Sequence, residues 1–130
     1  LIDNGRVYST DVCLPISKIT ECVNFAEAEV KKFGLKAPMV GHLGDGNFHV
    51  LLPYDPLKKD TYEKIRKFSD LLIDKTLELN GTITGEHGIG LHKKDYLLKE
   101  HADNIPVMKS IKRTLDPNNI MNPGKIFDLN

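Results

Sequence analysis

The segment GHLGDGNFH, residues 41–49, places two histidines symmetrically about an Asp-Gly pair. Asp-Gly between apolar arms predicts a two-residue hairpin turn at Asp45 and Gly46. This turn sets His42 directly opposite His49. Opposed side chains in an antiparallel pair share one face, with Cβ atoms about 4.5–5.5 Å apart. Both imidazoles can then reach one metal ion.

The two faces of this predicted hairpin differ in character. Asn47 projects on the same face as the histidines, and we expect it to contact a bound substrate. The opposite face is apolar and is expected to face the core; it carries Leu43, Phe48, Val50 and Leu52. A histidine on a strand is often only structural. Two ligands are also too few, because a catalytic metal site usually takes three protein ligands and an open position.

A second segment, GEHGIG at residues 85–90, offers a carboxylate to complete such a site. With Glu86 as the third ligand, His42 and His49 form a His₂Glu set suited to Zn²⁺ or Mn²⁺. The alternative is a glycine-rich turn with an exposed Glu and His. The segment is not a phosphate-binding loop, because it lacks the Lys-Ser/Thr of that motif.

Composition excludes several classes of function. The 130 residues carry zero formal net charge, so no basic surface predicts nucleic-acid binding. No apolar run approaches the ~20 residues of a membrane span. Cys13 and Cys22 have no CxxC spacing, which indicates reduced thiols and a cytoplasmic protein, with peripheral attachment to the inner membrane left open. The chain begins with Leu1, and we expect it to be part of a longer protein.

Hydrophobic periodicity predicts the elements that position these residues. The expected order is strand, helix, strand, strand, helix, strand, over residues 7–14, 16–33, 39–43, 48–53, 62–79 and 82–84. This order predicts an α+β fold, a ferredoxin-like βαββαβ antiparallel sheet with both helices on one face. Residues 1–103 then form the substrate-binding and metal-binding region. Residues 104–130 form a C-terminal helical tail, with a helix over 105–115.

Three motifs together resemble one protein family. GHLGDGNFH, GEHGIG and LDPNNIMNPGKIF are similar to the C-terminal part of FAD-linked 2-hydroxyacid oxidoreductases of the vanillyl-alcohol-oxidase type. Within that family the similarity is greatest to the D-lactate dehydrogenase and glycolate oxidase flavoprotein branch, and it covers nearly the whole chain. The resemblance implies that an N-terminal domain binds FAD, that this chain is the substrate-binding cap, and that its tail returns to the FAD domain.

The resemblance also implies a role for each site residue. It assigns the metal to His42, His49 and Glu86, the active-site base to His87, and a flavin contact to Asn122 in NPGK. The implied reaction oxidises a small D-2-hydroxy acid to a 2-oxo acid, and the isolated chain is expected to fold without dehydrogenase activity. Two alternatives remain open at this point: a stand-alone metal-dependent hydrolase and a non-catalytic ferredoxin-like module.

Overall fold

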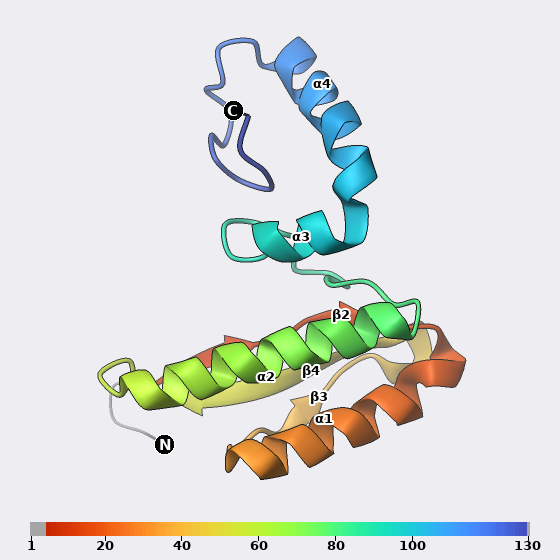
Figure 1. Ribbon diagram of the computed structural model, residues 1–130, viewed down its shortest axis with the longest axis vertical. Coiled ribbons are helices and arrows are strands. Elements are labelled where there is room, and N and C mark those ends of the chain that lie inside the picture. The colour runs from red at the N-terminus through yellow and green to blue at the C-terminus, as the bar shows by residue number, and fades with distance from the viewer. Residues whose placement is uncertain (1–4, 130) are drawn as a thin grey trace. The chain divides into compact units, whose positions relative to one another are not determined.

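The chain forms two compact units, which divide after Glu86 in the computed structural model that describes residues 5–129. The first unit carries the sheet and two long helices, and the second carries shorter helices and the C-terminal segment (Figure 1). The domain boundary expected from the sequence, after residue 103, lies inside the second unit.

An antiparallel sheet organises the first unit. Its strands are β1 (Arg6–Ser9), β2 (Val12–Cys13), β3 (Met39–Val40) and β4 (Asn47–Tyr54). The predicted first strand is present as β1 and β2, which pair with β4 in one continuous register, while β3 also pairs with β4. The predicted last strand is reduced to an antiparallel bridge between Cys13 and Thr82. This neighbour order confirms the predicted α+β, ferredoxin-like arrangement.

Helices α1 (Ile19–Phe33) and α2 (Lys59–Glu78) pack together on one face of the sheet, as predicted (Figure 1). A short 3₁₀ turn, η1 (Ile16–Lys18), leads into α1. Gly34 ends α1 in the left-handed conformation, at φ 65°, and its N–H bonds the Lys31 carbonyl. The core between sheet and helices contains Val12, Cys22, Ala26, Phe48, Val50, Leu52, Ile65, Phe68 and Leu72, all fully or almost fully buried.

The hairpin register differs from the prediction by two residues. Val40, not His42, lies opposite His49. A type I′ turn needs positive φ at both central residues, and for an L-residue that conformation costs about 1 kcal/mol or more. The chain instead forms a 3₁₀ turn, η2 (Leu43–Asp45), and only Gly46 of the predicted turn is left-handed. Leu43, expected in the core, is 53% exposed.

The second unit contains α3 (Lys94–His101), a 3₁₀ turn η3 (Ala102–Asn104) and α4 (Ile105–Leu115), followed by a segment rich in turns. The predicted helix over residues 105–115 is confirmed. Pro106 lies in its first turn, where the missing N–H costs no hydrogen bond. Over residues 5–129, the structure contains no helix with the length and apolarity needed to cross a bilayer.

Candidate metal and substrate site

The face of the sheet opposite the helices carries a cluster of polar side chains. Val12 and Phe48 are paired and buried against the helices, so their neighbours along each strand point to the other face. Those neighbours are Asp11, Asn47 and His49, and they are only 1%, 6% and 7% exposed. Polar groups buried to this extent require partners, and the partners define the site.

A local break between β1 and β2 orients His49. The pairs Ser9–Leu51 and Val12–Phe48 keep one register, so no residue is inserted at the break. The Thr10 hydroxyl accepts the Val50 N–H at 2.9 Å, while the Thr10 N–H donates to the Val50 carbonyl at 3.1 Å. The Thr10 carbonyl therefore accepts a hydrogen bond from His49 Nδ1, at 3.0 Å.

This hydrogen bond fixes which ring nitrogen of His49 faces the site. A carbonyl can only accept, so Nδ1 carries the hydrogen, and in a neutral ring Nε2 presents a lone pair. Glu86 Oε1 lies 3.0 Å from that Nε2. Two acceptor atoms at this distance require a proton or a cation between them. Ligand atoms about 2.0–2.2 Å from a zinc ion lie roughly 3.0–3.5 Å apart, so the separation also fits a shared metal.

Asp11 joins this pair, although the sequence analysis did not include it. Ligand atoms of Asp11, His49 and Glu86 lie within 4.8 Å of one another. The available signal was an acidic residue inside a strand with apolar neighbours, but no local pattern states that residues 11 and 86 meet. The structure brings together His49 and Glu86 of the predicted set, and their role as ligands stays a prediction.

His42 lies outside this group in the part of the chain that the structure describes. It is exposed and precedes η2, and its carbonyl accepts the Asn47 N–H at 3.3 Å. His42 lies beyond β3, which ends at Val40, so strand pairing does not set the face of its side chain. Its backbone stays beside β4 through the bond from the Asn47 N–H, and its role as a ligand stays a prediction.

His87 and Asn122, the other residues predicted from the family resemblance, belong to the second unit. His87 is exposed and is the first residue of that unit. Its predicted catalytic role and the predicted flavin contact of Asn122 are not tested by these observations.

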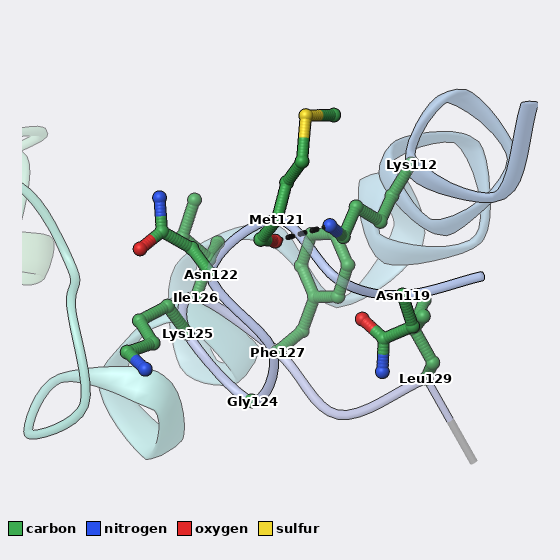
Figure 2. Close-up of a pocket in the computed structure, with 9 residues that line it drawn as sticks. All are labelled: Lys112, Asn119, Met121, Asn122, Gly124, Lys125, Ile126, Phe127 and Leu129. Carbon is green, nitrogen blue, oxygen red and sulfur yellow. Dashed lines mark hydrogen bonds between the residues drawn. The ribbon is translucent and has the colours of Figure 1, made fainter. Parts of the chain in front are cut away.

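Asn122 lines a pocket on the C-terminal segment (Figure 2). Lys112 anchors this segment through hydrogen bonds to Asp116 and to the Met121 carbonyl. The Lys112 ammonium, together with the N–H groups of Ile120 and Met121, holds the pKa of Asp116 below its usual value. The pocket holds about 130 Å³, which is below the roughly 300–1,000 Å³ of ligand sites, so it cannot enclose a flavin by itself.

Gly85 packs tightly against side chains of the sheet. A Cβ there would lie 1.8 Å from Asn47 Nδ2 and 3.0 Å from Asp11 Oδ1. The Asn47 amide cannot move away freely, because its nitrogen donates to Asp11 at 3.0 Å and to the Val12 carbonyl at 3.3 Å. Only glycine fits at this position.

We therefore expect Gly85→Ala to lower the free energy of unfolding by about 1–3 kcal/mol, the usual cost of overpacking. Gly44→Ala is the matched control, since a Cβ at Gly44 meets no atom within 4 Å. Urea unfolding monitored by circular dichroism measures both. Equal unfolding midpoints for the two variants would contradict the packing described here.

Comparisons with known proteins agree with the family resemblance that the sequence motifs indicate. The family model described as FAD linked oxidases, C-terminal domain, matches residues 1–126. The chain belongs to this family. This domain is 43% identical over 125 residues to a probable mitochondrial D-lactate dehydrogenase of Danio rerio, and the match covers 95% of this chain and 25% of that protein. It is 39% identical over 118 residues to the glycolate oxidase subunit GlcD of Bacillus subtilis, and that match covers 90% of this chain and 25% of that protein.

A solved structure supports the fold alone. The 4-ethylphenol oxidase of Gulosibacter chungangensis superposes with a TM-score of 0.66 over 98% of this domain and 26% of that chain, at 19% identity. The domain thus spans about a quarter of the length of the curated relatives that it matches. The names of several relatives include "mitochondrial", whereas the cytoplasmic location expected from the cysteines stays a prediction.

Proposed function

We propose that this domain is the metal-binding and substrate-binding part of an FAD-dependent D-2-hydroxyacid dehydrogenase of the D-lactate or glycolate type. The observation that carries the proposal is the approach of Glu86 Oε1 to His49 Nε2, 3.0 Å apart on the polar face of the sheet. In a domain that belongs to the FAD-linked oxidase family, this pair offers one nitrogen and one oxygen atom that could bind a metal. Family membership favours this reading over a stand-alone hydrolase or a non-catalytic module.

The donor set fits a divalent metal. An imidazole nitrogen and a carboxylate oxygen suit Zn²⁺ or Mn²⁺. His49 and Glu86 would hold the ion, with His42 as the third ligand from the adjacent loop. A divalent ion bound there would lower the pKa of the substrate hydroxyl and fix the substrate's orientation.

The hydrogen bonding of the Asn47 side chain supports a direct contact between Asn47 and the substrate. Both hydrogens of its amide nitrogen face acceptors, Asp11 Oδ1 and the Val12 carbonyl. Its oxygen, Oδ1, is buried and has no hydrogen-bond partner in the described part of the chain. A buried acceptor without a donor is costly, by about 1–3 kcal/mol, and a substrate hydroxyl would satisfy it.

His87 would remove the hydroxyl proton of the substrate. In the oxidation a 2-hydroxy acid loses one proton from oxygen and one hydride from Cα, which leaves a 2-oxo acid. FAD, held mainly by the N-terminal domain of the full-length protein, supplies the hydride acceptor. A histidine suits the proton transfer because imidazole titrates close to neutral pH in general.

The tail, residues 104–130, would dock on the FAD domain and bring Asn122 to the flavin. An apolar stripe on α4 supports this: Val107, Ile111 and Leu115 recur every four residues and are 61%, 56% and 71% exposed. Ile120 and Met121, which follow the helix, are exposed apolar residues as well. A contiguous exposed stripe of this kind marks an interaction surface.

The full-length protein that contains this domain provides the test. We expect it to be yellow, and D-lactate or glycolate added without oxygen should bleach the visible absorbance of its oxidised flavin. L-lactate should bleach it far more slowly, because the Cα hydrogen of the other enantiomer points away from the acceptor. A colourless protein, or a flavin that no small 2-hydroxy acid reduces, would refute the proposal.

A further inference from the structure

The buried carboxylate of Asp11 lies between the two segments that carry the candidate site. Its Oδ1 accepts from Asn47 Nδ2 at 3.0 Å, and its Oδ2 accepts from the Thr84 hydroxyl at 2.7 Å. The Glu86 N–H lies 3.2 Å from both oxygens. Asp11 is 1% exposed, and these donors help to stabilise its carboxylate in the interior.

These contacts help to hold the Glu86 segment in position. A backbone pair between Cys13 and Thr82 joins this segment to the sheet, with N–H to carbonyl distances of 2.8 and 3.2 Å. Beyond that pair, the Thr84 side chain and the Glu86 backbone are held by Asp11. The carboxylate of Asp11 thus ties the segment after Thr82 to the strand that carries Asp11.

Asp11 also faces the opposite side of His49 from the candidate metal position. Its Oδ1 lies 3.7 Å from Nδ1, whereas Glu86 Oε1 lies 3.0 Å from Nε2. The approach of Asp11 is thus on the Nδ1 side of the ring, which donates to the Thr10 carbonyl, whereas Glu86 lies on the Nε2 side. This geometry argues against Asp11 as a ligand of the ion that Glu86 and His49 would share.

We propose that Asp11 is a positioning residue: it fixes Glu86, and the amide orientation of Asn47, relative to His49. This inference rests on the proposed function for its metal, but the positioning itself is a property of the metal-free protein. Asp11→Asn keeps the size of the side chain and removes the charge and one acceptor oxygen. The new NH₂ group then faces one of three donors, from Asn47, Thr84 or Glu86.

Two readouts on the full-length protein test this proposal. The first is hydrogen–deuterium exchange of the metal-free protein, resolved at the Glu86 amide. We expect Asp11→Asn to speed exchange at Glu86 by ten-fold or more, and to leave the Thr82 amide, which bonds the Cys13 carbonyl, close to the parent. The second is a Mn²⁺ titration followed by electron paramagnetic resonance, in which Asp11→Asn should weaken binding by roughly 10–100-fold, as losses behind a metal ligand do.

A second pair of variants covers the case in which Asp11→Asn fails to fold. Thr84→Val removes one donor to Asp11 and nearly conserves shape, whereas Thr84→Ser keeps the hydroxyl. We expect Thr84→Val to shift both readouts in the same direction as Asp11→Asn and Thr84→Ser to restore the parent values.

The outcomes separate the two proposals. Unchanged exchange at Glu86 in both Asp11→Asn and Thr84→Val overturns the positioning role, even when the parent binds Mn²⁺. A parent that binds no Mn²⁺ or Zn²⁺ overturns the proposed metal site, and the exchange at Glu86 still decides the positioning role. Faster exchange at Glu86 with unchanged Mn²⁺ affinity restricts Asp11 to ordering the segment and refutes its effect on the metal.

Discussion

His49→Ala in the full-length protein should remove most of the bound metal and most of the activity while FAD stays bound. His49 is buried, and the Thr10 carbonyl fixes its ring so that Nε2 faces Glu86. Losing a ligand should lower metal affinity by more than ten-fold, since even changes behind a ligand cost roughly 10–100-fold. Metal content by elemental analysis and flavin content by absorbance, measured on the same sample, check this.

His42→Ala extends the same experiment to the residue whose position changed most from the prediction. We expect it to lose metal as well, because the His42 carbonyl accepts the Asn47 N–H and so holds the loop that carries His42 beside the strand of His49. His92→Ala is the matched control, an exposed histidine outside the proposed ligand set. Full metal occupancy in His42→Ala, together with loss in His49→Ala, would remove His42 from the ligand set and leave His49 and Glu86 as its protein members.

The element order was predictable because each element carries its own periodic signal. The apolar spacing of α1 and α2, the left-handed Gly34 and the strand alternation around Phe48 are all local properties of the sequence. Local signals that agree with one another specify the α+β arrangement. The tail helix, residues 105–115, was predictable for the same reason.

The hairpin register was not predictable from the Asp-Gly pair alone. The expected turn required a left-handed Asp45, and the chain avoids that cost with a 3₁₀ turn closed by Gly46. A Cβ at Gly46 would also lie 2.1 Å from the Leu14 carbonyl oxygen. This glycine is therefore needed for close approach to the residue that follows β2, a tertiary reason that the hairpin motif does not contain.

Asp11 shows why part of the candidate site escaped the sequence analysis. Its partners, Asn47, Thr84 and Glu86, are distant in sequence and meet it only after the sheet forms. The strand alternation predicts which face Asp11 occupies, but no local pattern predicts that a break in the strand turns the Thr10 carbonyl toward His49. Motifs predicted the candidate ligands His49 and Glu86, and only the fold brings Asp11 beside them.

The largest expected effects separate Glu86 from its neighbour His87. Glu86 is assigned as a metal ligand, because its Oε1 faces His49 Nε2 at 3.0 Å. Glu86→Gln replaces that carboxylate with a weaker, neutral donor. The variant should contain little metal, with affinity reduced ten-fold or more, and added Mn²⁺ or Zn²⁺ should partly restore its activity.

His87 is assigned as the base, so His87→Ala should keep its metal and lose roughly 10²–10⁴ in rate. Added metal should not restore the rate. Steady-state rates with D-lactate and an artificial electron acceptor, measured with and without added Mn²⁺ and paired with metal analysis, distinguish the two residues. If Glu86→Gln stayed metal-replete and His87→Ala became metal-poor and rescuable, the two roles would be exchanged, and the pairing of Glu86 with His49 would serve only to orient the imidazole.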